Sequence, residues 1–126
     1  MKVKYIIIAQ VILLAGAVVL GLILKGDLAD GPRVLHRAIG GLAGGVSLIS
    51  AIVMLRHGIG MTQKTLSWVA VAFSFLAGFA GSSLRTVGSY DMMFGLMSIS
   101  GFIALAAAIA LLVLVIKRDS VANTTK

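Results

Sequence analysis

Four long apolar runs constrain the fold of this chain more than any other feature. They cover residues 5–24, 34–55, 66–84 and 92–116. At about 1.5 Å of rise per residue, a helix of each length crosses a hydrocarbon core of about 30 Å. The chain has 126 residues, of which 60% are hydrophobic, and a soluble core of that size cannot bury so much apolar side chain. The sequence predicts one all-α integral membrane domain, residues 1–126, with four transmembrane helices.

Short connections join the four runs and carry residues that begin and end helices. Asp-Gly-Pro at 30–32 precedes the second run, and Gly88 precedes the fourth. Such short connections place sequential helices side by side in opposite directions, so we expect an antiparallel four-helix bundle. The triplet Leu-Ala-Gly at 14–16 recurs at 76–78 in the third run. This match leads to the hypothesis that the bundle consists of two repeated helical hairpins.

Basic residues are divided unequally between the two sides of such a bundle. They give the chain a formal net charge of +7, but they lie at the ends of the apolar runs, so membrane topology explains them and nucleic acid is not an expected partner. One side would carry Lys2, Lys4, Arg56, Lys64, Lys117, Arg118 and Lys126, and the other Lys25, Arg33, Arg37 and Arg85. The positive-inside rule therefore predicts a plasma-membrane protein with both termini in the cytoplasm.

Residue composition excludes several classes of function. The absence of cysteine excludes disulfides, thiolate metal sites, covalent c-type haem attachment and a thiol nucleophile. There is no glutamate, and the four aspartates lie at loop positions, so no membrane-embedded carboxylate is predicted for a coupled transporter. His36 and His57 lie at opposite ends of the second run and form no hydrolytic site. Electron transfer and a role as an accessory subunit remain.

The start of the second run combines a histidine with glycines at helical spacing. His36 shares one helix face with Gly40, Gly44 and Ser47, so the imidazole stands above a groove. A haem needs an imidazole directed at its iron and room for the edge of its ring, which glycine provides. The alternative is structural: Gly40/Gly44 and Gly41/Gly45 are both GxxxG pairs, which commonly pack membrane helices together, and a histidine at a helix start often makes one interfacial hydrogen bond.

A second haem ligand would come from the fourth run. On the repeat alignment Met93 lies opposite His36, and methionine sulfur can be an axial haem ligand. Met92 and Met97 compete with it, and methionine is also an ordinary core or lipid-facing residue. A His36/Met93 pair is therefore one interpretation, and a structural Met93 is the other.

The residues Val-Leu-His-Arg-Ala at 34–38 and Gly-Ser-Ser-Leu-Arg-Thr-Val-Gly-Ser at 81–89 carry a resemblance to a known family. The layout resembles one half of the haem A synthase family, whose two four-helix halves each hold a haem between histidines on their second and fourth helices. The resemblance implies a b-type haem near the outer face, bound at His36, in a respiratory or other redox system. Arg37 and Arg85, with Arg33, would then pair with the haem propionates, with headgroup contact as the alternative.

The chain departs from that family at two places. Residues 92–94 (Met-Met-Phe) occupy the position of the fourth-helix histidine, and Arg33 stands where the family's catalytic Glu-x-x-His pattern needs glutamate. Haem A synthesis is therefore not expected, and the chain is not expected to be an enzyme on its own. Two interpretations remain: a b-type haem electron-transfer protein, or a cofactor-free accessory subunit that packs against partner subunits or a second copy.

Gln10 is a polar residue inside the first apolar run. Hydrocarbon offers an amide no hydrogen-bond partner, so burial against another helix is favoured. We therefore expect Gln10 to make an interhelical hydrogen bond.

Overall fold

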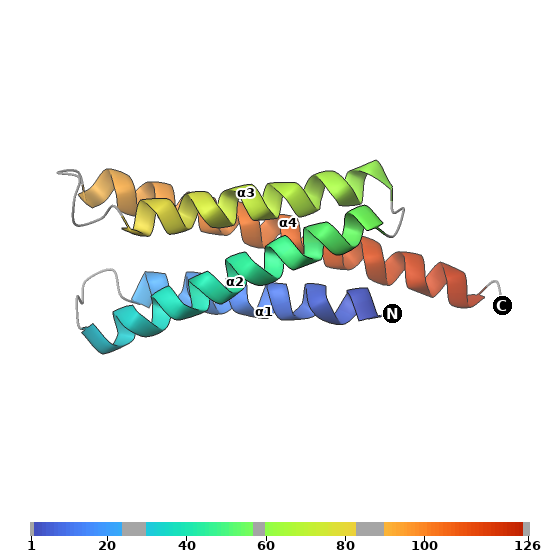
Figure 1. Cartoon of the computed structure of the whole chain (residues 1–126), viewed down its shortest axis with the longest axis horizontal. Helices are drawn as coiled ribbons and strands as arrows, with labels where there is room; N and C mark the ends of the chain where they lie inside the picture. The colour runs from blue at the N-terminus through green and yellow to red at the C-terminus, as the bar shows by residue number, and fades with distance from the viewer. Residues whose placement is uncertain (1, 24–29, 57–59, 83–89, 125–126) are drawn as a thin grey trace.

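The structure, a computed structural model, consists of four long helices (Figure 1). It describes residues 2–23, 30–56, 60–82 and 90–124. The helices are α1 (Lys2–Ile23), α2 (Asp30–Arg56), α3 (Met61–Ser82) and α4 (Tyr90–Thr124). The described residues contain no strand. The all-α fold and its four helices, one for each apolar run, confirm the prediction from the sequence.

The four helices form an antiparallel bundle of two hairpins, α1 with α2 and α3 with α4 (Figure 1). Each helix packs against its neighbours in the chain, and contacts between α1 and α4 close the ring. Two apolar clusters hold the bundle together. One contains Ile7, Met54, Leu111 and Val115, and the other contains Leu14, Ala43, Ala104 and Ala108.

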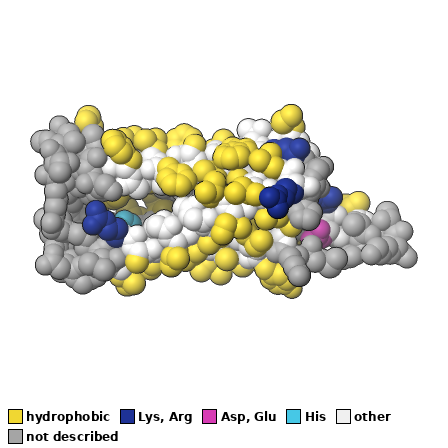
Figure 2. All heavy atoms as spheres, in the orientation of Figure 1, with side chains coloured by type: hydrophobic (Ala, Val, Ile, Leu, Met, Phe, Trp, Pro, Cys, Tyr) yellow, Lys and Arg dark blue, Asp and Glu magenta, His cyan; other side chains and the backbone are white. Residues whose placement is uncertain are grey.

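Apart from the large residues of the two clusters, the interior of the bundle consists mostly of small side chains, and many large apolar side chains face outward. Among the residues whose burial is described, seven of the thirteen buried hydrophobic residues are alanines, and four serines are buried as well. Isoleucine, leucine and phenylalanine side chains cover the outer surface (Figure 2). In water this arrangement would leave far more apolar surface exposed than a soluble monomer tolerates. Lipid removes that penalty, and small interior residues let helices approach closely, as in membrane bundles.

Three helices contain segments long and apolar enough to cross a membrane: Val3–Leu22, Leu35–Arg56 and Phe94–Val121. The chain is therefore consistent with a multi-pass membrane protein. The third predicted span, 66–84, lies mostly in α3, and its last two residues fall outside those described. Over its described residues α3 is not a candidate membrane span, unlike the other three helices. Its first turn carries Gln63 and Lys64.

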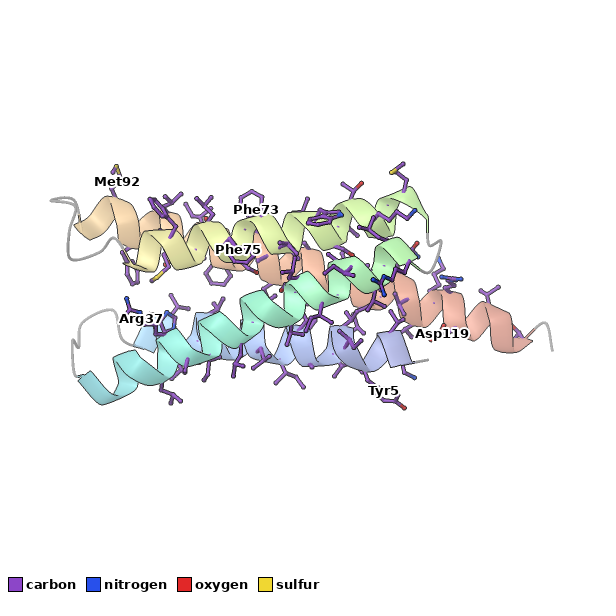
Figure 3. The ribbon with its side chains drawn as sticks, in the orientation of Figure 1. Tyr5, Arg37, Phe73, Phe75, Met92 and Asp119 are labelled. Carbon is purple, nitrogen blue, oxygen red and sulfur yellow. The ribbon has the colours of Figure 1, made fainter. Side chains whose placement is uncertain are left out.

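Basic side chains gather at the end of the bundle where the N- and C-terminal helix ends lie (Figures 1 and 2). The described members of this group are Lys4, Arg56, Lys64, Lys117 and Arg118. At this end α4 projects past the other helices, and Arg37 lies at the opposite end (Figure 3). The helix arrangement thus places these basic residues as the charge count predicted.

The two Leu-Ala-Gly triplets differ in their surroundings. Leu14 is 4% exposed and belongs to an apolar cluster, whereas Leu76 is 37% exposed. A Cβ built at Gly16 would contact Ile39, but one built at Gly78 would meet open space. The two triplets therefore differ in packing, and the hypothesis of two repeated hairpins stays a prediction.

Candidate functional site

The candidate site lies on the inward face of α2, in its half nearer the start of the helix. Asp30, Gly31 and Pro32 form the first turn of α2, where proline's missing N–H costs nothing. His36 follows one turn later and is half-buried. Below it on the same face lie Gly40, half-buried, then Gly44 and Ser47, both buried. The histidine thus stands above the glycine face that helical spacing predicts.

The imidazole of His36 lies against α1. A Cβ built on Gly21 would come within 3.1 Å of His36 Cε1. The ring also hydrogen-bonds to the backbone of Ala17, one turn before Gly21. The Ala17 N–H belongs to the helix ladder, so its carbonyl is the group free to accept a second hydrogen bond. Gly21 therefore gives the ring access to a carbonyl that a side chain would cover.

One nitrogen of the imidazole lacks a hydrogen-bond partner within the part of the chain that the structure describes, and both nitrogens lie near α1: a Cβ built on Gly21 would be 3.7 Å from Nε2 and 3.8 Å from Nδ1. His36 Nδ1 is buried and has no hydrogen-bond partner among the described residues. Because Nδ1 is unpaired, Nε2 is the nitrogen that bonds to Ala17. In the neutral ring Nε2 then carries the proton, and Nδ1 keeps an unshared electron pair. In metal-binding histidines, one ring nitrogen binds the metal and the other commonly donates a hydrogen bond to a backbone carbonyl.

A hollow lies beside this histidine. Cβ atoms built on Gly40 and Gly44 would meet nothing within 4 Å, although Gly44 itself is buried. Figure 2 shows the hollow between the two hairpins, next to the cyan histidine. It opens on the side of the bundle, at a right angle to the long axis of the helices (Figure 2). In a membrane that side faces lipid, so the hollow is accessible to membrane-dissolved molecules.

The structure describes the other predicted site residues only in part. Arg37 follows His36 in the chain and is exposed at the same end of the bundle (Figure 3). Met93 lies in the first turn of α4, but its side chain is outside those described, and the same holds for the side chain of Arg33. Arg85 and His57 fall outside the described residues. The His36/Met93 pair and the propionate contacts stay predictions.

The two methionines that compete with Met93 are both described. Met92 is 58% exposed and points away from the bundle (Figure 3). Met97, one turn further along α4, is half-buried. Met97 is therefore better placed than Met92 to contribute to the interior.

The amide of Gln10 makes the interhelical bond that was expected. Its Nε2 donates to Ser47 Oγ at 3.0 Å, and both residues are fully buried. This bond joins α1 to α2 below the glycine face, and it confirms the prediction.

Sequence reasoning missed Ala17 and Gly21, the two α1 residues that hold His36. Both look like ordinary members of an apolar run, and only the crossing of α1 and α2 brings them to the imidazole. It also missed the buried serines Ser50, Ser67 and Ser100, for which a signal existed. A serine inside an apolar run is expected to face protein, where its hydroxyl can find a partner.

The described residues contain no group of three or more His, Cys, Asp or Glu side chains that could hold a metal ion. A haem needs only one or two axial side chains, so its requirement is different. No family model matches the chain, and no curated protein or solved structure matches it. The resemblance to the haem A synthase family therefore rests on the residues at 34–38 and 81–89.

Proposed function

We propose that this protein binds a b-type haem in the hollow beside His36 and transfers electrons in a respiratory or other redox system of the plasma membrane. One observation carries the proposal: His36 has a buried Nδ1 without a hydrogen-bond partner among the described residues, and a hollow lies beside this histidine (Figure 2). A buried nitrogen without a partner is costly, and a ligand that accepts its electron pair would remove that cost.

The residues present fit an axial imidazole. The ring is held on one side by the backbone of Ala17 and the glycine surface of Gly21, which fixes its tautomer and orientation. Further along the same face of α2, Cβ atoms built on Gly40 and Gly44 would meet no other atom within 4 Å, which leaves room for a ligand. The haem would supply one-electron redox chemistry, and this chain's part is to bind and orient it. Met93 remains the proposed second ligand.

The charge distribution supports a position for the haem near the outer face. His36 lies at the end of the bundle opposite Lys4, Arg56 and Lys64 (Figure 1). By the positive-inside rule those basic residues face the cytoplasm, which puts His36 on the outer side. Arg37, and with it Arg33 and Arg85, would then be available to haem propionates at that surface.

The proposal is tested by a reduced-minus-oxidised visible spectrum of protein purified from haem-supplied cells. We expect a b-type α-band that is absent from His36→Ala and retained in His57→Ala. The second variant is a matched control, because it removes the chain's other histidine, at the far end of the same apolar run. A wild-type protein without an α-band, or an α-band that survives in His36→Ala, would overturn the proposal.

A second candidate function is that of a cofactor-free accessory subunit, and the outward face of α2 favours it. Gly41 and Gly45 are exposed, and Cβ atoms built on them would meet nothing within 4 Å. Such a face lets the backbone of another membrane helix approach closely. The two functions separate by co-purification: an accessory subunit keeps a partner that Gly41→Leu releases, and it shows no α-band.

A further inference from the structure

A polar layer crosses the middle of the bundle between its two apolar clusters. On α1, Gln10 lies between Ile7 of one cluster and Leu14 of the other. On α2, Ser47 and Ser50 lie between Ala43 and Met54, which belong to opposite clusters. Gln10, Ser47 and Ser50 are at most 1% exposed. These three polar residues, which we call the Gln10 layer, are therefore enclosed on both sides by apolar side chains.

Hydrogen bonding within the Gln10 layer is incomplete. Gln10 Nε2 donates to Ser47 Oγ, but Gln10 Oε1 and Ser50 Oγ have no partner among the described residues. Turning the amide over would pair Oε1 with the Ser47 hydroxyl and leave Nε2 unpaired instead. In either orientation the layer holds two fully buried polar groups that need a partner, and native interiors rarely leave such groups unsatisfied.

The two unpartnered groups belong to neighbouring positions of the α1/α2 interface. Ser47 and Ser50 are three residues apart on one helix, which places their Cβ atoms about 5–6 Å apart. Gln10 is bonded to Ser47, so its amide lies one helical turn of α2 from the buried Ser50. A water molecule between them could donate to the amide oxygen and also bond to the hydroxyl.

The chemistry of the layer favours water over an ion. All of its polar groups are neutral, and a buried cation needs a compensating negative charge. The four aspartates of the chain, Asp27, Asp30, Asp91 and Asp119, lie in connections or near helix ends, far along the chain from the layer. Water is neutral, and it both donates and accepts, so it satisfies the layer in either amide orientation.

We propose that the Gln10 layer is a binding site for a water molecule, held between Gln10 and Ser50 at the centre of the membrane bundle. This site joins α1 to α2 where the apolar clusters alone would leave two polar groups unpaired. It lies below the hollow at His36 and does not depend on haem binding.

Selective ¹⁵N-glutamine labelling tests the proposal directly, because the chain contains only Gln10 and Gln63. Water-edited solid-state NMR of the full chain in lipid vesicles should show magnetisation transfer from water to the side-chain amide of Gln10. Gln63, in the first turn of α3, is the positive control. In Ser50→Ala the Gln10 signal should be lost or strongly reduced. Transfer to Gln63 without transfer to Gln10 in the wild-type protein would overturn the proposal.

The sign of a stability change gives a second, independent test. If water bridges Gln10 and Ser50, Ser50→Ala removes a partner and lowers the Tm of the protein in detergent. If the Ser50 hydroxyl is unpaired, the same variant removes a buried unsatisfied group and raises the Tm, which contradicts the proposal. Ser98→Ala is the control, because it makes the same substitution on α4 one turn before Gly101, which packs against Val18, two turns along α1 from Gln10. Ser98→Ala should leave the Gln10 water signal unchanged.

Discussion

The imidazole of His36 and the backbone of Gly21 are in direct contact across the α1/α2 interface, with His36 Cε1 3.1 Å from where a Cβ on Gly21 would lie. This contact does two things at once. It brings a ring nitrogen to the backbone of Ala17, and it leaves Nδ1 without a partner among the described residues. Residues of α1 therefore orient the imidazole of His36, the proposed haem ligand, whereas the glycines beside the hollow belong to α2.

Gly21→Ala should disturb the histidine without breaking the bundle. The added methyl group forces the ring to move by a few tenths of an ångström and strains its hydrogen bond to Ala17. A net hydrogen bond contributes about 1 kcal/mol, so we expect about 1 kcal/mol of lost stability, measured by thermal unfolding in detergent. We also expect a weaker or shifted haem α-band.

The control for that variant is Gly41→Ala, on the outward face of α2. A Cβ there meets open space, and alanine favours a helix over glycine by about 1 kcal/mol. The stability of Gly41→Ala should be unchanged or higher, and its α-band should be that of the wild type. If the two variants behave alike, Gly21 does not position His36.

The bond between Gln10 and Ser47 should be measurable as a coupling energy. Hydrogen bonds between membrane helices contribute about 0.6 kcal/mol on average, and up to about 1.7 kcal/mol. A double-mutant cycle of Gln10→Leu and Ser47→Ala should therefore give a coupling of about 0.5–1.5 kcal/mol in unfolding free energy. Strictly additive variants would show that the 3.0 Å contact contributes nothing.

The fold could be predicted from the sequence because lipid imposes simple rules. Each apolar run corresponds to one helix, since backbone polar groups must be satisfied within the segment. The helices extend a few residues beyond most of the runs: α4 reaches Thr124, whereas the apolar run ends at 116. Hydropathy measures the part in contact with hydrocarbon, and a helix continues into the headgroup region wherever its hydrogen bonds permit.

The candidate site could be predicted only in part. Helical spacing placed His36, Gly40 and Gly44 on one face because they belong to a single element. Spacing along α2 could not place Gly21, because the contact depends on where α1 crosses α2. The groups that face Ser50 could not be predicted from its position in α2 either, because they depend on the same packing between helices. Neighbours on one helix can be predicted from the helical period. Contacts between two helices can be predicted only when the way the helices pack is known.

Filling the hollow should abolish haem binding while the bundle stays folded. Gly44→Leu places a large side chain in space where a Cβ meets no other atom within 4 Å. We expect loss of the α-band with a change in stability of no more than about 1 kcal/mol. Gly45→Leu, one residue further along and exposed, carries the same substitution outside the hollow. An α-band that persists in Gly44→Leu at wild-type intensity would show that the hollow is not the haem site.

The proposed orientation can be tested cleanly because the chain has no cysteine. A single cysteine at Thr124, the last residue of α4, should be protected from a membrane-impermeant maleimide in intact cells and react after permeabilisation. A single cysteine at Ser89, in the connection between α3 and α4, should react in intact cells. These outcomes follow from basic side chains at the terminal end of the bundle, which the positive-inside rule assigns to the cytoplasm. The reverse labelling pattern would move His36 to the cytoplasmic side and, with it, the expected side of the redox partner.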